Sequence, residues 1–302
     1  MGEAFYRDDS DKAEFQNLFI TWLLFEEEPA MPSNEAIQAA LEKRFGATQL
    51  VNPEDLRSFA LLERVAEFQD GSVPVQAVFG SPMPFAQEEV GPMDRSQFWN
   101  MSDGNERLSR CTHKVLLTAL MTSALEYKDR AHLAVEQLQT AMELFPDCAL
   151  ILPHASHNLV DPDFVRRMEG DPDFASDAVR FIACFVSPRF FNVGDTDEMV
   201  CDTLGLFALG LPDVQIHFRD FDPNLMVSHM LDIATYQFDG NCPIQNGETV
   251  DSVRPDGSLD RIHMWPCQYE ESMVTPIRTV LDIEPGIYAG GNRHHEEEPL
   301  PQ

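Results

Sequence analysis

The residues best suited to chemistry are two histidines and an aspartate at the end of a predicted strand. His154 and His157 lie in the segment PHASHN, and Asp161 follows shortly after. Neutral imidazoles and a carboxylate are ligands that zinc and iron accept in proteins. The pattern therefore allows a metal site in a hydrolase-like enzyme. The alternative is a pair of ordinary loop histidines before a helix start, since no further strong ligand is evident.

A second candidate is a thiol near an imidazole. Cys111 and His113 are two positions apart, so on a strand they would share a face. A catalytic thiol needs a lowered pKa and an orienting third group, and the sequence indicates neither. The chain also lacks the G-x-S-x-G, P-loop and G-x-G-x-x-G patterns. We therefore predict no catalytic residue and no cofactor.

Large side chains in polar surroundings are candidates for contacts with a partner. Arginine and tryptophan are frequent anchors of protein interfaces. The alternative for the tryptophans is insertion into the core, because large apolar side chains usually bury. The residues in question are Arg95, Trp99, Arg189 and Trp265.

These candidates must be held by strands and amphipathic helices, and the hydrophobic pattern locates both. Residues 18–25 are an apolar run of strand length, which predicts a strand buried on both faces. The first eighty residues predict the order β-α-β-β-β, with a hairpin of residues 59–68 and 73–79. Residues 127–145 have the clearest amphipathic helix pattern of the chain.

The C-terminal half is organised around residues 202–238, where apolar and polar residues alternate over 214–219 and predict a strand. Asp222 and Pro223 then predict a helix start, and residues 181–191 are interpreted as a strand. The fold class expected is α+β, with mixed or antiparallel sheets, amphipathic helices packed on one face, and two sub-domains. The predicted divisions are a flexible acidic N-terminus (1–16), an N-terminal α+β domain (17–168), a C-terminal α+β domain (177–284) and a flexible tail (285–302).

The charge of the chain restricts its partners. The 302 residues include 21 basic and 51 acidic side chains, for a net charge of −30. Such a chain repels nucleic-acid phosphates and anionic lipids, so we expect neither nucleic acid nor membrane as a partner. The six cysteines are scattered without a C-x-x-C pair, and no signal peptide or membrane-length apolar run is evident. We therefore expect a cytoplasmic protein.

Several segments together resemble a group of bacterial proteins whose C-terminal half is a domain of unknown function. The most specific of them is DTLGLFALGLPDVQIHF at 202–218. The resemblance implies a bacterial, cytoplasmic origin, and it supplies no activity or catalytic residue. The other segments are RSQFW at 95–99, PH at 153–154, RFF at 189–191, NGETVDSV at 246–253 and WPCQYEES at 265–272.

Charge, fold class and the lack of a catalytic pattern favour a non-enzymatic acidic binding protein. The leading hypothesis is an immunity- or antitoxin-like inhibitor of a basic bacterial effector, so the expected partner is a protein with a basic surface. One alternative is a metal-dependent hydrolase-like enzyme that uses His154, His157 and Asp161. Another is a homo-oligomeric structural protein. The sequence does not specify the oligomeric state.

Overall fold

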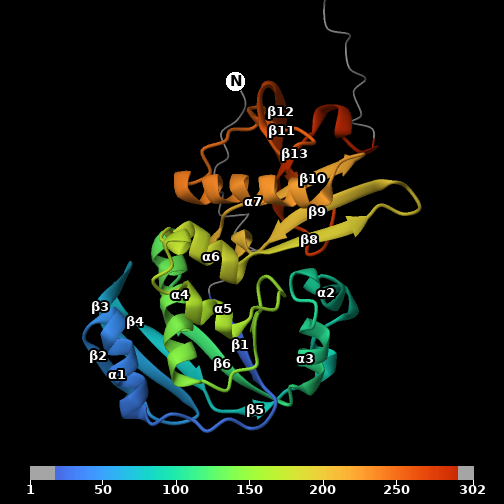
Figure 1. Ribbon diagram of the computed structural model, residues 1–302. Coiled ribbons are helices and arrows are strands. Elements are labelled where there is room, and N and C mark those ends of the chain that lie inside the picture. The colour runs from blue at the N-terminus through green and yellow to red at the C-terminus, as the bar shows by residue number, and fades with distance from the viewer. Residues whose placement is uncertain (1–17, 292–302) are drawn as a thin grey trace, which may run out of the picture. The chain divides into compact units, whose positions relative to one another are not determined.

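The computed structural model describes residues 18–291 (Figure 1), so the predicted N-terminal segment 1–16 lies outside the described residues. The chain forms two compact units, and the division between them falls after Val186. Each unit is built on its own β-sheet with helices, and the predicted α+β class with two sub-domains is confirmed. Among residues 18–291, no helix combines the length and the apolarity needed to cross a bilayer.

The N-terminal unit contains a seven-stranded sheet in the order β2-β3-β4-β6-β1-β7, with β5 paired to β6. Neighbouring strands are antiparallel, and β1 is an interior strand because it pairs with both β6 and β7. This position explains the continuous apolar run of its sequence, since both faces of β1 are covered. The strands are β1 Thr21–Phe25, β2 Thr48–Asn52, β3 Leu56–Phe68, β4 Gly71–Gly80, β5 Met83–Pro84, β6 His113–Leu120 and β7 Leu150–Pro153.

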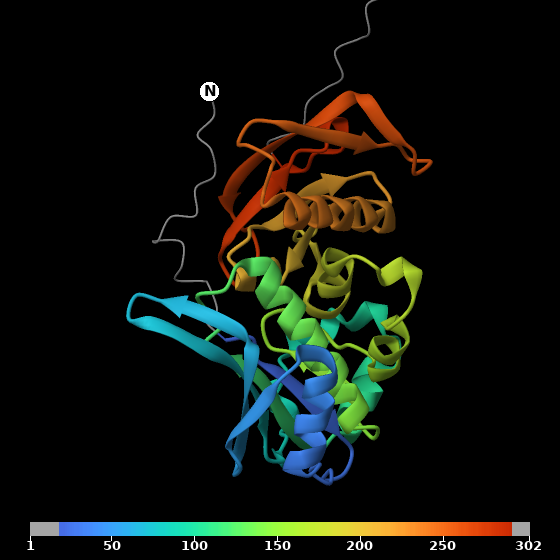
Figure 2. The ribbon, with the colours of Figure 1, turned by 90° about the vertical axis from the view of Figure 1, so that its left-hand side faces the viewer.

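Helices cover the two faces of this sheet differently. Figure 2 shows α1 and α4 side by side along one face, where Phe25 of β1 packs against Phe145. Trp22 and Leu24 point to the other face, because side chains alternate along a strand. There they meet an apolar cluster from the segment 85–111. The helices are α1 Asn34–Phe45, α2 Pro92–Ser96, α3 Gly104–Arg110, α4 Tyr127–Leu144, α5 Pro162–Met168 and α6 Asp177–Phe185, with 3₁₀ turns η2 Gln87–Glu89, η3 Phe98–Asn100 and η4 Pro172–Phe174.

The C-terminal unit contains a six-stranded mixed sheet in the order β11-β12-β13-β10-β9-β8. Only the β10–β13 pair is parallel among these strands. Helix α7 packs on β9 and β10, and Asp222 caps its first turn by accepting from the Asn224 amide. The elements are β8 Ser187–Asn192, β9 Glu198–Leu204, η5 Leu206–Leu209, β10 Asp213–Arg219, α7 Pro223–Gly240, β11 Thr249–Val253, β12 Leu259–Glu271, β13 Thr279–Ile283 and η6 Gly286–Tyr288.

Two boundaries differ from those expected from the sequence. Residues 181–185 are helical rather than a strand, because the buried Ala178, Phe181 and Phe185 recur at helical spacing in α6. Helix α6 packs on α4, so the N-terminal unit extends to Val186 instead of ending near residue 168.

The C-terminal segment also differs from the predicted tail. Residues 285–291 are ordered against β10, where the Gly290 amide donates to the His217 carbonyl at 3.0 Å. Ala289 bridges to Phe218 and is buried. Residues 292–302 of the predicted tail lie outside the described residues.

Candidate functional site

The N-terminal unit contains a cavity of about 280 Å³, here called the Trp22 pocket. It lies where β1, β7 and the segment 85–94 meet, and it contains both histidines of the PHASHN segment. Its lining is Ile20, Trp22, Phe85, Glu89, Val90, Asp94, Leu152, Pro153, His154 and His157.

Local backbone structure places the two histidines at the pocket. The His154 amide donates to the Ile20 carbonyl at 2.9 Å, so His154 extends the pairing of β7 with the chain before β1. His157 has a left-handed backbone with φ of 52°, and its amide donates to the Pro153 carbonyl. This tight turn brings the two imidazole rings to 5.6 Å between centroids.

The carboxylate beside the histidines is Asp94, and not the predicted Asp161. Nδ1 of His157 lies 3.1 Å from Oδ1 of Asp94. Asp161 does not line the pocket, because it caps α5 through the Asp163 amide and lies 3.4 Å from Arg107. Among residues 18–291, no group of three or more His, Cys, Asp or Glu side chains is arranged to hold a metal ion.

The charges at the pocket are set by burial and by one lysine. Burial, with a smaller contribution from His157, lowers the pKa of His154 below its usual value. Lys114 is buried, pairs with Glu89, and holds its Nζ 4.3 Å from the centroid of the Trp22 ring. Burial raises the pKa of Glu89, but hydrogen bonds from Lys114 and the Ala86 amide more than offset this, so the pKa is lowered.

The predicted interface residues have different environments. Trp99 is 45 % exposed and remains accessible to a partner. Arg95 donates to the carbonyls of Val90 and Gln87, so its guanidinium holds the segment that covers the Trp22 pocket. Trp265 is buried and packs edge-on against Phe221 and His229. Trp265 therefore fits the alternative of insertion into the core. The role of Trp99 as an interface residue stays a prediction.

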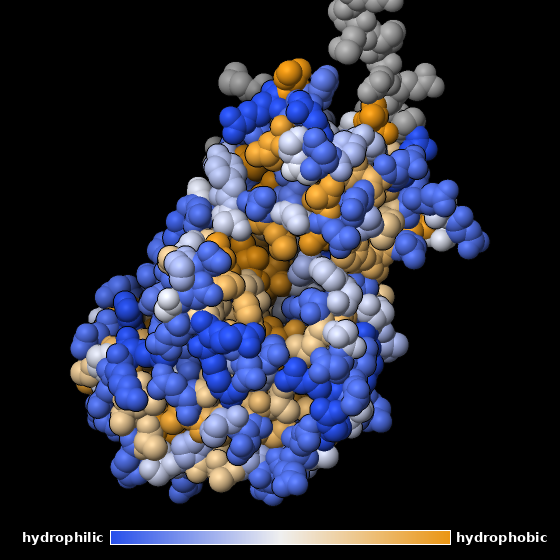
Figure 3. All heavy atoms as spheres, viewed as in Figure 1, coloured by the Kyte–Doolittle hydropathy of each residue, from blue (hydrophilic) through white to orange (hydrophobic). Residues whose placement is uncertain are grey.

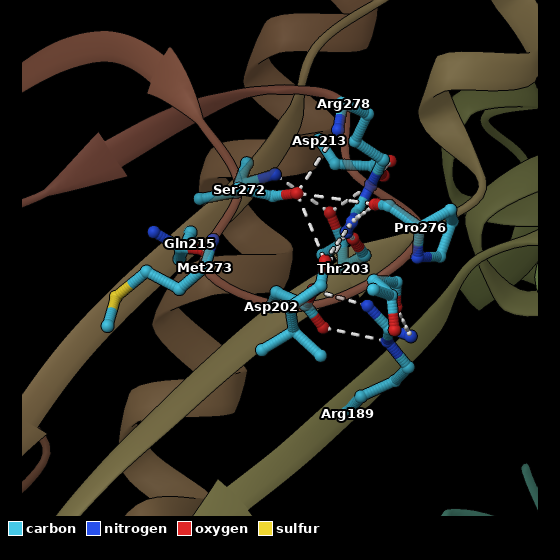
Figure 4. Close-up of polar contacts among 12 residues, drawn as sticks. Arg189, Asp202, Thr203, Asp213, Gln215, Ser272, Met273, Pro276 and Arg278 are labelled. Carbon is cyan, nitrogen blue, oxygen red and sulfur yellow. Dashed lines mark hydrogen bonds and ion pairs between the residues drawn. The ribbon is translucent and has the colours of Figure 1, made fainter. Parts of the chain in front are cut away.

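Arg189, the fourth of these residues, belongs to a buried ion network in the C-terminal unit (Figure 4). Its Nε and Nη2 donate to the two carboxylate oxygens of Asp202 at 2.9 and 2.5 Å. Asp202 also accepts from Nη2 of Arg278 at 2.8 Å, and Nε of Arg278 donates to Asp213 at 2.8 Å. All four side chains are at most 5 % exposed. Such burial keeps them from a substrate, so their role is to hold structure.

The network holds the loop 272–278 between β12 and β13. Arg278 donates from Nη1 to the carbonyls of Val274 and Pro276, and Arg189 donates to that of Thr275. The Met273 amide donates to Oε1 of Gln215 at 2.8 Å. The loop is therefore fixed from its inner side, while the side chains of Met273 and Ile277 are 46 % and 45 % exposed. No pattern in the sequence indicated this arrangement.

The cysteines do not form a nucleophilic site. All six are free thiols and all are buried. Burial raises the pKa of Cys111 to about 11, and the neighbouring Glu26 adds to this. The ring of His113 lies 2.9 Å from the Thr112 hydroxyl. The thiol of Cys111 is therefore protonated near neutral pH and is a poor nucleophile.

Comparison with known protein families finds a match within the C-terminal unit. No curated protein and no solved structure matches the chain. The matched segment contains Asp202, Asp213, Gln215 and Arg278, so most of the buried ion network lies inside it, whereas Arg189 and the Trp22 pocket lie outside. Residues 202–284 match the family model described as Domain of unknown function (DUF4261).

Proposed function

We propose that the protein is a non-enzymatic binding protein that captures a protein with a basic surface. Its class would be that of immunity- or antitoxin-like inhibitors of a basic bacterial effector in the cytoplasm. The observation that supports this proposal is the distribution of charge between interior and surface.

Burial does not neutralise the acidic excess of the chain. Within residues 18–291, four basic and four acidic side chains are buried, so burial removes both signs equally. The excess of carboxylates therefore faces solvent, and hydrophilic residues cover most of the face shown in Figure 3. The buried charged residues are Lys114, Arg130, Arg189, Arg278, Asp202, Asp213, Asp260 and Asp282.

Many of the remaining arginines are already engaged by carboxylates of the same chain. Arg44 contacts Glu136, Glu143 and Glu169, and Arg180 also contacts Glu136. Smaller pairs of this kind are Arg110–Glu26, Arg166–Asp163 and Arg261–Asp251. These arginines are thus less available to an acidic partner, whereas carboxylates such as Glu27 and Glu28 are exposed to solvent.

A surface of this kind accelerates the encounter with a basic partner. Long-range attraction raises association rates, and the gain falls with ionic strength as the charges are screened. Binding should therefore weaken steeply between low and high salt, mainly through the association rate.

Affinity capture tests the proposal. The immobilised protein is exposed to lysate of its own organism at low salt, washed, and eluted with rising salt before mass spectrometry. We expect one stoichiometric basic protein that elutes with salt, and a slower association rate for a Glu27→Gln/Glu28→Gln variant. An empty column, or a partner whose binding does not change with salt, would contradict the charge argument.

The two alternative hypotheses predict different results. A hydrolase that uses His154 and His157 requires stoichiometric metal in protein purified without a chelator or an affinity tag. A homo-oligomeric structural protein requires a solution mass that is a multiple of 34.1 kDa. Metal analysis and light scattering on one sample test both.

A further inference from the structure

We propose that the Trp22 pocket binds a planar organic cation, a guanidinium or amidinium group on an apolar stem. This inference concerns a small-ligand site in the N-terminal unit, and it does not depend on the proposed capture of a basic protein.

The polar groups of the pocket are suited to accept hydrogen bonds. Four side chains of the lining can accept hydrogen bonds: the carboxylates of Glu89 and Asp94, and the imidazoles of His154 and His157. Ionised carboxylates only accept, and a neutral imidazole has one accepting nitrogen. Nδ1 of His157 lies 3.1 Å from Oδ1 of Asp94, and whichever ring nitrogen of a neutral imidazole carries no proton can accept. Among these lining residues, Trp22 contributes an indole N–H donor, and none has a hydroxyl, amide, lysine or arginine side chain. A ligand that supplies several N–H donors matches this set.

The balance of charge at the pocket favours a single positive charge on the ligand. Two cations lie near the pocket: Lys114 is buried and is neutralised by Glu89, and the guanidinium of Arg95 donates to the carbonyls of Val90 and Gln87. The lowered pKa of His154 keeps that ring neutral near pH 7. The carboxylate of Asp94 also lines the pocket, with Oδ1 3.1 Å from Nδ1 of His157.

The walls of the pocket suit the apolar stem of such a ligand. Ile20, Phe85 and Leu152 contribute to walls that are mainly apolar, beside the indole of Trp22. The position of Lys114 over the Trp22 ring shows that this indole already attracts one cation. A volume of about 280 Å³ is below the range of drug-sized sites, which begins at about 300 Å³, and so fits a one-ring ligand.

The positions of the acceptors favour an organic cation over a metal ion. Glu89 and Asp94 lie on the segment 87–96, whereas the histidines lie on the loop after β7. No three metal-ligating side chains converge among the described residues. A planar cation with N–H groups on several edges can reach acceptors that one small ion cannot contact together.

The test is a titration of the full chain with benzamidine, followed by calorimetry and by tryptophan fluorescence. Two compounds of nearly the same shape are the controls: benzamide, which is neutral, and benzoate, which is negatively charged. We expect benzamidine to bind at least tenfold more tightly than benzamide, and benzoate not to bind. Equal affinities for benzamidine and benzamide, or no binding of benzamidine, would overturn the proposal.

A matched pair of variants tests whether the ligand binds beside Asp94. Asp94→Asn removes one charge at the pocket, and Glu106→Gln removes one from an exposed site on α3. Asp94→Asn should weaken benzamidine binding at least tenfold with an unchanged circular dichroism spectrum, and Glu106→Gln should leave it unchanged. Equal effects of the two variants would mean that the cation responds to the overall charge, and the site would be rejected.

If Asp94→Asn altered the spectrum, perturbation of histidine NMR signals by benzamidine in the unmodified chain decides instead: shifts of His154 and His157 support the site, and shifts elsewhere reject it.

Two further probes distinguish the sources of such a cation. Agmatine represents a free small guanidinium compound, and the capped peptide Gly-Arg-Gly represents an arginine of a protein. Binding of both, with the same loss in Asp94→Asn, assigns the pocket to an arginine side chain as well as to small ligands. Binding of agmatine alone assigns it to a small molecule. If neither competes with benzamidine, the guanidinium assignment fails.

Discussion

Arg278 and Asp213 are 65 positions apart in the sequence, yet Nε of Arg278 donates to Oδ2 of Asp213 at 2.8 Å in the interior of the C-terminal unit. The same guanidinium also donates to Asp202 and to the carbonyls of Thr203, Val274 and Pro276. Five acceptors thus meet the five N–H donors that a guanidinium has. A lysine could not satisfy this set, because its ammonium has only three donors.

Replacement of Arg278 by methionine should destabilise the C-terminal unit strongly. Breaking a buried pair leaves an uncompensated charge, and we expect the free energy of unfolding to fall by about 3–5 kcal/mol. Urea unfolding followed by circular dichroism measures this. Arg261→Met is the control, because Arg261 is an exposed arginine on β12 and should cost less than about 1 kcal/mol. A double variant Arg278→Met/Asp213→Asn should recover part of the loss, and similar losses for Arg278→Met and Arg261→Met would refute the role of the network.

Gln215→Met should loosen the loop 272–278 without unfolding the sheet. The change removes the acceptor of the Met273 amide and the donor to Asp282. We expect hydrogen exchange at Met273 to become at least tenfold faster, since an amide without its acceptor opens more readily. Gln268→Met alters an exposed position of β12 and should leave the exchange of the loop unchanged. Slow exchange in the Gln215 variant would mean that other contacts hold the loop.

Gly290→Ala should detach the segment 285–291 from β10. A Cβ on Gly290 would lie 2.4 Å from the His217 ring, which is largely buried and pairs with Glu198. Overpacking of this kind costs about 1–3 kcal/mol. Thermal unfolding and limited proteolysis near Tyr288 would detect the change. Gly91→Ala is the control, because its Cβ would have ordinary contacts and its φ is −67°; a thermal shift as large as that of Gly290→Ala would contradict the steric argument.

Acid should destabilise the N-terminal unit through Glu136. Burial raises the pKa of this carboxyl, but Arg180 and Arg44 outweigh that effect, so the pKa lies below its usual value of 4.5. A lowered pKa in the folded state means that this stabilisation is present above about pH 4.5 and is lost as the pH falls through the folded value.

Urea midpoints at pH 6 and at pH 3.5 measure this dependence. Glu136→Gln should be less stable than the unmodified chain at pH 6, and the difference should shrink at pH 3.5. A difference that is the same at both pH values would show that ionisation of Glu136 contributes nothing.

Local patterns predicted most of the fold, because strands and helices depend on neighbouring residues. The β3–β4 hairpin, α4 and α7 follow from alternation, helical periodicity and caps within one segment. The strand predicted over residues 181–191 is wrong for residues 181–185, because an apolar run of this length fits a strand and a helix equally. The partners of the site lie far apart in sequence, and so no spacing pattern joins Asp94 to His157 or Arg278 to Asp202. The interface prediction for Arg189 depends on residue type alone, and no local pattern indicates that its acceptor is Asp202 inside the same unit.

The order of synthesis gives the ion network a further consequence. Arg278 is made 76 residues after Asp202 and 65 residues after Asp213, and β13, the parallel neighbour of β10, follows it directly. A chain halted on the ribosome before Arg278 would have to bury Asp213 without its cation, which is strongly unfavourable. The last strand of the N-terminal sheet, in contrast, ends at Pro153. The N-terminal unit can therefore fold during translation. The C-terminal unit can complete its buried ion network only after Arg278 has been synthesised.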